Sequence, residues 1–569
     1  MPLHTLHELD RTEGTVRLRQ ALAVAASGGD ADAVADRVLV PRPSANDPND
    51  PLRWPRWRKH VAFAAVCAFT FLTNFAIGGL APAFYPLSLE FDKTASETSA
   101  LLLWPILVLG VFNFVWVPVA NYVGKRPVFV GASALLCASY VWGACAGSFR
   151  SLLWSNIVAA FAGSTTEALG ASIVNDLYFL HERGAKMGLY MNAIAGGNTI
   201  GPLICGFIVT GLSWRWHKWL AVILTALNFL AVLFGVPETR YLRDADQNVG
   251  LSPVDIERLN GRSGGGEASA AAATATGNTE PGAQTGDVDD VEKQTKSTGQ
   301  SLPVPLTSPS SSSVSSVVAV PKKTWLQEIS LWSGITPGTS LVRMFARPLP
   351  MFAYPCVVYA FLGYAVSLVV TVAVNLLNSF VLQAPPYNWS PSVNGLINIP
   401  GFLGNLLGGY AGGWLVDVFC DWRLRRHNNG VFEPESRLYL LVLPALITGA
   451  GCVLFGYGVQ ETLHWTSLFF GYGMVSFALT AVPTITMAYV SDCLLPVNAD
   501  ALMLVNGSKN IVAFGFLYGI VPWVDKVGYV DCFGAQAGIF VAIIALGAAI
   551  LIPFGAQIRH RQAKWRIIL

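Results

Sequence analysis

Two ionisable side chains inside apolar stretches are the residues of this chain best placed to do chemistry. Glu167 lies in the middle of the apolar run 152–176, and Lys509 lies in the apolar run 502–522. A charged side chain at the centre of a lipid-spanning helix costs roughly 2.5–3.5 kcal/mol on insertion scales, so such residues are functional candidates. Glu167 could take up a proton or pair with a cationic substrate, and Lys509 could neutralise an anionic group.

Each of these two residues also has a structural interpretation. Gly163 and Gly170 lie at i−4 and i+3 from Glu167, so its helix face suits close packing, with the carboxylate a buried acceptor between helices. Lys509 is only a few residues from one end of its run and could extend its ammonium group to the membrane surface. The sequence leaves both interpretations open.

Asparagines in the apolar runs form a second tier of candidates for substrate or proton coupling. The residues chosen from this tier are Asn74, Asn375 and Asn398. Asn394, Asn398 and Asn405 share one face of their run. The competing interpretation is interhelical hydrogen bonding, worth about 0.6 kcal/mol on average in membranes.

The composition indicates what kind of element carries these side chains. Of 569 residues, 53% are hydrophobic and 13% are charged, whereas soluble proteins carry roughly 25% charged residues. The net charge of +2 gives no basic field for nucleic acid, so the expected surroundings are a lipid bilayer. We predict a polar cytosolic tail over 1–58, a disordered cytosolic linker over 238–348 with a short helix from Trp325 to Trp332, and a basic cytosolic tail over 557–569.

The apolar runs are about 20 residues long, which suits helices that cross about 30 Å of hydrocarbon. They predict an all-α membrane protein with twelve transmembrane helices in two six-helix bundles, over 59–237 and 349–556. The expected spans are about 60–80, 97–117, 127–147, 152–176, 188–212 and 217–236 in the first half, and about 351–377, 393–416, 437–458, 465–490, 502–522 and 533–556 in the second.

Lysine and arginine place the loops relative to the membrane. They gather in alternate loops and near both ends of the chain, so the positive-inside rule puts both termini in the cytosol. The loop 214–218 falls on the outer side against this bias, although its tryptophans suit a membrane interface. We expect the plasma membrane and a monomer.

No pattern in the chain predicts an enzyme. All eight histidines lie at or beyond the expected span ends, and no metalloprotease, nucleophile-elbow or P-loop motif is present. The nine cysteines lie mostly inside the spans, where they act as small apolar residues. We therefore expect no catalytic residues, no cofactor and no metal. The sequon at Asn388 is close to the membrane, and we do not expect it to be glycosylated.

The expected fifth span contains a specific glycine pattern, Gly188, Gly197, Gly201-Pro202 and Gly206. The segment Asp47-Pro-Asn-Asp-Pro-Leu-Arg-Trp-Pro55 and the loops after spans four and eight add to it. These stretches resemble the major facilitator superfamily, specifically the fungal drug:proton antiporter type, over about 47–556 without the linker.

The resemblance implies a fold of two rocking six-helix bundles and assigns roles to small and charged residues. The expected gating and packing residues are Gly188, Gly197, Gly201, Pro202, Gly206, Gly404, Gly408 and Gly412, with spans five and eight packed at the bundle interface. The expected cytosolic charge latch comprises Gly124, Lys125, Arg126, Asp176, Glu182, Arg183, Gly413, Asp417, Arg423 and Asp492. For the latch residues the alternative is topology alone.

The chain departs from the family pattern at three places. Val117 and Asn121 replace the family's glycine and aspartate, and the arginine expected within 156–163 is missing. Its proton-coupling role therefore cannot be transferred to this chain.

The sequence thus predicts a secondary active transporter that works by alternating access. The expected activity is proton-coupled efflux of a small organic molecule, a drug-like compound or secondary metabolite. The alternatives are proton-coupled uptake of an organic cation or nutrient, and a receptor that binds substrate without moving it.

Overall fold

The computed structural model describes residues 16–17, 43–44, 47–241, 322–328, 330, 341–385, 387–426, 431–494 and 497–562. Most of the expected linker and of both tails lies outside these residues. Of the expected helix from Trp325 to Trp332, the described part forms α11 (Trp325–Glu328), and Trp332 lies outside the described residues.

The first half of the chain is helical. Its elements are η1 (Pro51–Arg53), α2 (Arg56–Ile77), η2 (Gly78–Ala83), α3 (Phe84–Glu90), α4 (Ala95–Val123), α5 (Lys125–Ala144), α6 (Phe149–Leu177), α7 (Leu180–Gly211) and α8 (Trp214–Gly235). The α2 helix tightens into the 3-10 helix η2 at Gly78-Gly79, and with α3 this first apolar helix continues to Glu90 rather than ending near residue 80.

The second half follows the same plan. Its helices are α12 (Leu341–Ala346), η3 (Leu349–Ala353), α13 (Pro355–Gln383), α14 (Pro391–Leu396), α15 (Asn398–Tyr410), the π-helical turn η4 (Ala411–Leu415), α16 (Val416–Arg426), η5 (Pro434–Leu441), α17 (Val442–Gln460), α18 (Trp465–Cys493), α19 (Asn498–Tyr518), α20 (Ile520–Val527) and α21 (Tyr529–Gln562). Two short strands, β1 (Val16–Arg17) and β2 (Val431–Phe432), pair antiparallel.

Within the described residues, eleven helices are long and apolar enough to cross a membrane. The expected eighth span, 393–416, lies in a series of shorter segments, α14, α15, η4 and α16. Pro400 has no N–H for the carbonyl of Leu396, and α14 ends at Leu396. A π-helical turn interrupts the series again at Ala411–Leu415.

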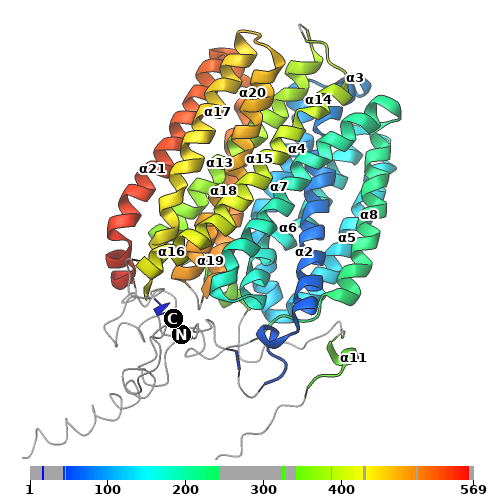
Figure 1. The fold of residues 1–569 in the computed structure, drawn as a ribbon. Coiled ribbons are helices and arrows are strands. Elements are labelled where there is room, and N and C mark those ends of the chain that lie inside the picture. The colour runs from blue at the N-terminus through cyan, green and yellow to red at the C-terminus, as the bar shows by residue number, and fades with distance from the viewer. Residues whose placement is uncertain are drawn as a thin grey trace, which may run out of the picture.

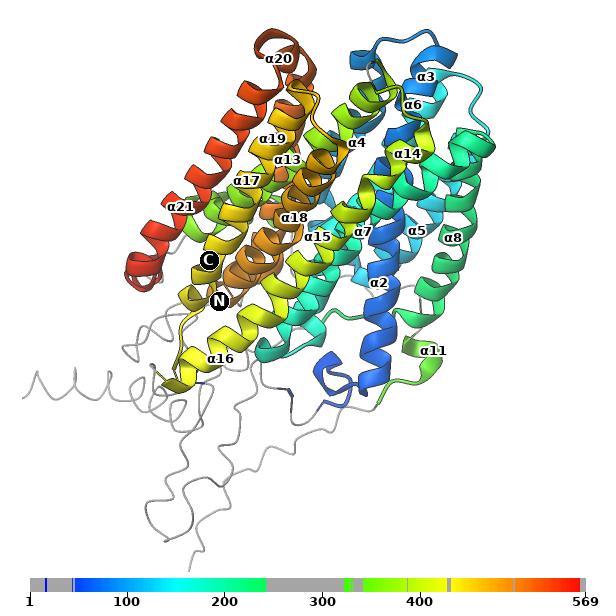
Figure 2. The same cartoon turned by 45° about the horizontal axis from the view of Figure 1, so that its top comes forward.

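The helices form two groups that lie side by side (Figures 1 and 2). We call α2–α8 the N bundle, α12–α21 the C bundle, and the interface between them the seam. Along the seam α4 packs on α19, and α7 packs on α14, α15 and α18. The start of α2 and the end of α21 lie at the same end of the molecule (Figure 1).

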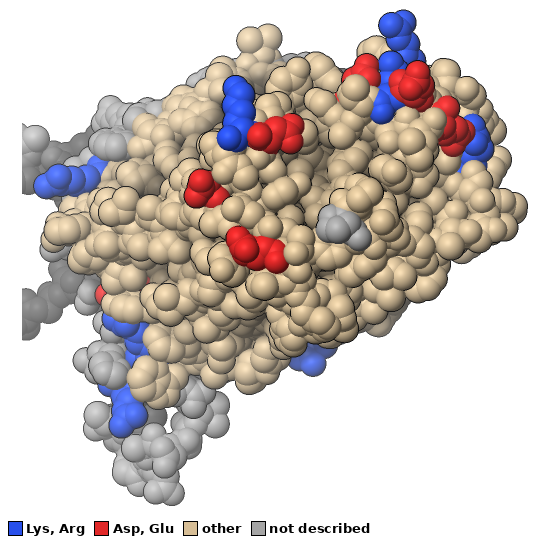
Figure 3. Space-filling model, turned by 90° about the horizontal axis from the view of Figure 1, so that it is seen from above, with Lys and Arg blue, Asp and Glu red and all other residues tan. Residues whose placement is uncertain are grey.

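The opposite end, where α3 and α20 lie, is mostly uncharged, and its charged side chains lie either in small mixed groups or, for some acidic ones, alone (Figure 3). We call it the outer end, following the expected topology. Two ion pairs of this region are Lys93–Glu97 at 3.2 Å and Arg215–Glu90 at 3.3 Å.

Candidate functional site

The two ionisable residues singled out from the sequence meet across the seam. Lys509 Nζ on α19 lies 3.4 Å from Glu167 Oε2 on α6. The side chain of Lys509 is 1% exposed and that of Glu167 is 5% exposed. The pair therefore joins the two bundles through a buried ionic contact.

Polar neighbours on α19 complete the carboxylate's surroundings. Asn510 Nδ2 donates to Glu167 Oε2 at 2.8 Å, and Asn506 Nδ2 donates to the backbone carbonyl of Glu167 at 2.8 Å. Asn506 and Asn510 are i−3 and i+1 from Lys509, so one stretch of α19 supplies all three contacts. A substrate or proton that neutralises Glu167 would act on a bond between the bundles.

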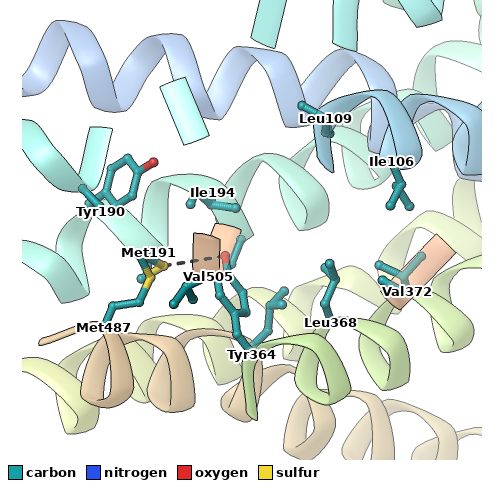
Figure 4. Close-up of a cluster of buried hydrophobic side chains, with 14 of the residues drawn as sticks. Ile106, Leu109, Tyr190, Met191, Ile194, Tyr364, Leu368, Val372, Met487 and Val505 are labelled. Atoms are coloured by element: carbon teal, nitrogen blue, oxygen red, sulfur yellow. Dashed lines mark hydrogen bonds between the residues drawn. The ribbon is translucent and has the colours of Figure 1, made fainter. Parts of the chain in front are cut away.

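The ammonium group of Lys509 contacts an aromatic ring as well as the carboxylate of Glu167. Lys509 Nζ lies 3.9 Å from the ring centroid of Tyr364 on α13, a cation–π contact. The Tyr364 hydroxyl points at Met191 Sδ on α7, 3.8 Å away (Figure 4). The ammonium group is thus held between a carboxylate of the N bundle and a ring of the C bundle.

Besides Lys509, apolar side chains from both bundles lie around Tyr364 (Figure 4). Buried side chains of this cluster are Ile106 and Leu109 on α4, Tyr190, Met191 and Ile194 on α7, Leu368 and Val372 on α13, Met487 on α18 and Val505 on α19. Aliphatic, thioether and aromatic groups suit an amphipathic organic molecule.

Glycines let the helices around the pair approach one another. A Cβ at Gly110 of α4 would lie 3.0 Å from the carbonyl oxygen of Gly507, and a Cβ at Gly507 of α19 would lie 2.5 Å from the Phe114 ring. Next to Glu167, a Cβ at Gly170 would lie 2.5 Å from the ring of Tyr190. The small-residue face around Glu167 therefore serves close packing as well as the site.

The surface-reaching interpretation of Lys509 is wrong, because its ammonium group is buried on Glu167 and Tyr364. The pairing could not be predicted from the sequence, because it depends on the relative rotation of α6 and α19.

Two of the expected asparagines, Asn375 and Asn398, meet at the hydroxyl group of Tyr472, and Asn74 lies elsewhere. Asn74 Nδ2 donates to Thr70 O at 3.0 Å, and Asn74 Oδ1 accepts from Asn198 at 3.4 Å. Asn398 accepts from Tyr472 at 3.4 Å. Asn375 lies on α13 and is half-buried. These bonds match the interhelical alternative for Asn74 and Asn398.

The glycines of α7 face two neighbours. Gly197 and Gly201 meet α2, where a Cβ at Gly201 would lie 2.6 Å from Phe75 O. Gly188 and Gly206 meet the C bundle, where their added Cβ atoms would lie 2.5 Å from the carbonyl oxygens of Gly409 and Pro391. Pro202 lies inside α7 beside Gly201.

The glycine ridge of the expected eighth span does not face α7. Added Cβ atoms at Gly404, Gly408 and Gly412 would clash with backbone oxygens of α18, namely those of Gly473, Phe477 and Ala481. Spans five and eight do pack on each other at the seam, as expected, since α7 contacts α14 and α15, but this ridge packs on α18 within the C bundle. Gly409 and Gly413 contact α7 instead. The glycines that contact α18 and those that contact α7 differ because the two neighbours lie against different faces of this span.

The charged residues of the expected latch fall into two clusters. In the N bundle, Lys125 Nζ contacts Asp176 and donates to Ser172 Oγ at 2.8 Å. Arg126 donates to Leu233 O at 2.6 Å, and its backbone N–H donates to Glu238 at 3.2 Å. Gly124, with φ of 116°, makes the turn between α4 and α5 that places both basic residues.

The second cluster centres on Arg437, which is not among the expected latch residues. Arg437 Nη1 lies 2.7 Å from Asp417 Oδ1, and Arg437 Nε lies 2.7 Å from Asp492 Oδ2. Asp417 also accepts from the backbone N–H of Ala185 on α7 at 2.9 Å, so it crosses the seam. In the sequence, the one feature that could have indicated Arg437 is the loop after the eighth span, which contains acidic residues and Arg437.

The remaining latch residues are placed differently from one another. Arg423 does not pair with Asp417. It donates to the Tyr439 hydroxyl at 3.3 Å and stacks on that ring. Arg183 is buried and lies 3.5 Å from Asn175 O, and Glu182 lies in the first turn of α7. A Cβ at Gly413 would lie 2.8 Å from Gly184 O across the seam.

The largest correction concerns the loop expected outside the membrane at 214–218. This stretch is the first turn of α8, and the side chains of His217 and Lys218 are fully buried in the N bundle. His217 therefore does not lie at a surface. Glu167 and Lys509 are also not the only ionisable side chains within the helices, as Lys218, Arg437 and Arg559 show. Hydropathy alone does not identify these residues as buried, because the carbonyl and carboxylate groups that make their burial possible lie on other helices.

Within the described part of the chain, no group of three or more His, Cys, Asp or Glu could hold a metal ion.

Comparisons with known proteins all match the chain to one family of transporters. The sequence profile described as Major Facilitator Superfamily matches residues 66–511. An uncharacterised MFS-type transporter of Schizosaccharomyces pombe is 26% identical over 549 residues, 93% of this chain and 89% of that protein. The MFS antiporter QDR3 of Candida albicans is 22% identical, over 89% of this chain and 79% of that protein. The proton:xylose symporter XylE superimposes with a TM-score of 0.57 at 14% identity, over 88% of this chain and 96% of that structure.

Proposed function

The chain belongs to the Major Facilitator Superfamily and is a multi-pass membrane transporter, and from this premise we propose that it exports a small amphipathic organic molecule in exchange for protons. In this proposal Glu167 carries the exchangeable proton, and substrate binds in the apolar cluster around Tyr364. The observation that carries the proposal is the buried contact between Glu167 and Lys509 across the seam.

Proton uptake by Glu167 would remove the charge that attracts Lys509. The ammonium group would keep its contact with the Tyr364 ring, and Asn510 would keep a hydrogen bond to the carboxyl group. One bond between the bundles is thereby weakened while the site stays hydrogen-bonded. This is how a proton can bias the relative position of two packed bundles.

Contacts at both ends of the seam support an alternating mechanism. At the outer end Gln383 Nε2 donates to Pro82 O at 3.0 Å. At the other end Ala185 N donates to Asp417 at 2.9 Å and Asn175 Nδ2 donates to Ser491 Oγ at 3.4 Å. A substrate between the bundles reaches one side only when one of these sets of contacts separates.

Two of the relatives have names that support the direction that we propose. The Candida albicans relative is named an antiporter, and a relative from Aspergillus flavus, 23% identical over 85% of this chain and 99% of that protein, is named a probable efflux pump. Export in exchange for protons agrees with both names.

The second candidate is proton-coupled uptake of an organic cation. The contacts of Lys509 favour it, because a carboxylate and an aromatic ring that hold an ammonium group 3.4 Å and 3.9 Å away would also hold a substrate cation. Such a cation would compete with Lys509 for Glu167.

Flux into proteoliposomes under an imposed pH gradient tests the proposal. Tetraphenylphosphonium is a suitable probe because it carries a permanent charge, so an acidic lumen does not trap it, and valinomycin with potassium holds the membrane potential at zero. Exchange with protons predicts accumulation in vesicles with an acidic lumen, and symport predicts accumulation in vesicles with an alkaline lumen.

Protein-free vesicles give the background for this measurement. Binding of the probe, measured by quenching of tryptophan fluorescence, without flux under either gradient would contradict transport and support a receptor.

A further inference from the structure

The N bundle holds a second buried lysine, which the proposed mechanism does not use. Lys218 Nζ donates to the Asn156 side-chain oxygen at 2.7 Å and to the backbone carbonyl of Ala76 at 2.9 Å. It also lies 5.4 Å from the centroid of the Tyr140 ring. None of these partners is a carboxylate, and no ion pair of Lys218 occurs among the described residues.

The neighbouring histidine reaches the same segment. His217 Nε2 lies 3.1 Å from the carbonyl oxygen of Phe75, and the rings of His217 and Phe75 are in contact, with centroids 4.9 Å apart and planes tilted by 30°. Among the described residues, buried His217 Nδ1 has no hydrogen-bond partner. Consecutive basic residues of α8 thus hold consecutive carbonyls of Phe75 and Ala76.

Those carbonyls mark the place where α2 ends. The α-helix stops at Ile77 and continues as the 3-10 helix η2. A backbone carbonyl oxygen has two lone pairs and can accept a second hydrogen bond, which is stronger when the donor is an ammonium group. A protonated Lys218 is therefore held by the end of α2 as well as by Asn156.

The segment beyond this break touches the other bundle. Gln383 of α13 donates to Pro82 O in η2, and η2 also packs on α14. On its other side, a Cβ at Gly79 would lie 3.0 Å from Gly201 of α7. The orientation of η2 therefore affects whether the outer end of the seam is closed.

We propose that Lys218, assisted by His217, is a proton-dependent clamp on the end of α2 that keeps η2 against the C bundle. When Lys218 carries its proton, the ammonium group holds Ala76 O and Asn156 and the outer end stays closed. When the proton leaves for solvent, the amine loses its attraction to the helix end and to the Tyr140 ring, and η2 separates from α13.

The groups that face Lys218 come from every helix around it. They are Ala76 O on α2, Tyr140 on α5, Asn156 on α6, Cys205 on α7 and His217 on α8. Burial of an ammonium group among neutral acceptors is costly, so a proton on Lys218 is exchanged more readily than one paired with a carboxylate. This distinguishes it from Lys509.

Accessibility of a cysteine at the outer end tests the clamp without any substrate, so the result is independent of the proposed transport. Ser379→Cys places a thiol on α13 at a buried position one turn before Gln383. The rate of maleimide labelling at this position, read by mass spectrometry and divided by the rate in denatured protein at the same pH, reports opening.

In protein that is otherwise unaltered, the normalised rate should rise about tenfold from pH 6 to pH 9. Lys218→Arg keeps a charge throughout this range and should give a low, flat profile. Lys218→Met should give a high, flat profile. Asn156→Ala removes one acceptor and should shift the rise to lower pH, which tests the clamp if Lys218→Met does not fold.

Lys93→Met is the matched control, since it removes an exposed lysine near the same end and should leave the profile unchanged. A profile in Lys218→Arg identical to that of the unaltered protein would overturn the proposal. So would an unchanged profile in both Lys218→Met and Asn156→Ala.

Discussion

The interior of the C bundle and the seam both contain buried ion pairs, but the two are built differently. Arg437 holds Asp417 and Asp492 of its own bundle at 2.7 Å each, and Asp417 in addition accepts from Ala185 N across the seam. The contact of Lys509 with Glu167, at 3.4 Å, lies wholly between the two bundles. A short, doubled contact tolerates little movement. A single longer contact, shared with an aromatic ring, can be exchanged for a proton or a substrate.

Glycines show the same contrast. Inside the C bundle, Gly404, Gly408 and Gly412 form a continuous row against the backbone of α18. On the seam, Gly188 and Gly206 make separate close approaches near opposite ends of α7. Continuous backbone contact fixes two helices, while contacts at the two ends can separate one at a time. Stability should therefore depend on the bundle interior, and transport on the seam.

The largest effect is expected from Arg437→Met. It leaves two buried carboxylates without their cation, and removal of one partner from a buried pair costs about 3–5 kcal/mol. The temperature of thermal unfolding in detergent should fall strongly, together with the yield of folded protein. Arg423→Met is the control, because Arg423 donates to the Tyr439 hydroxyl and stacks on that ring but forms no ion pair among the described residues. Equal losses in both variants would refute the structural weight given to Arg437.

The next largest changes, in unfolding temperature and in transport rate, are expected from alanine substitution of two glycines. Gly404→Ala inserts a methyl group against the Gly473 carbonyl inside the C bundle, and overpacking of this kind costs about 1–3 kcal/mol. Gly188→Ala makes a similar approach to Gly409 O on the seam, where the bundles can separate to relieve it. We expect Gly404→Ala to lower the unfolding temperature more, and Gly188→Ala to lower the transport rate more.

Gly515→Ala is the control for this comparison, since a Cβ there meets nothing within 4 Å. A larger loss of stability in Gly188→Ala than in Gly404→Ala would reverse the comparison.

A smaller effect should come from the seam pair itself. Lys509→Met leaves Glu167 without its cation, and Glu167→Gln removes the charge that Lys509 balances, so the double variant should lose less stability than the sum of the two single variants. Coupling energies of residues in contact are about 0.5–3 kcal/mol. Unfolding temperatures of the four proteins give this coupling, and strictly additive losses would show that the contact contributes nothing.

The sequence predicted the helices well because hydropathy is a local property of a 20-residue segment. It also identified Glu167 and Lys509 individually, since a charge inside an apolar run is visible without a structure. Their pairing was not predictable, because it depends on the rotation of two helices that are far apart in the chain. Lys218 was assigned to an outer loop for a related reason, as its acceptors lie on α2 and α6.

For the eighth span, the sequence predicted the helix but neither its interruptions nor its packing partner. Its apolar run predicted a helix correctly, but Pro400 and the π-helical turn at Ala411–Leu415 divide it into shorter segments. The row of glycines in this run predicted close packing without naming the partner. The partner is α18, because only the folded arrangement shows which face of the helix looks toward which neighbour.

The central claim is that the Glu167–Lys509 contact couples protons to movement across the seam. Glu167→Gln tests it most directly when two transport modes are compared in the same vesicles. One mode is accumulation of tetraphenylphosphonium driven by a pH gradient. The other is exchange of labelled for unlabelled probe at equal pH, which requires the bundles to move with substrate but does not require net proton movement.

We predict that Glu167→Gln loses gradient-driven accumulation at least tenfold while the exchange rate stays within about twofold of the unaltered protein. Gradient-driven accumulation in Glu167→Gln equal to that of the unaltered protein would contradict the claim.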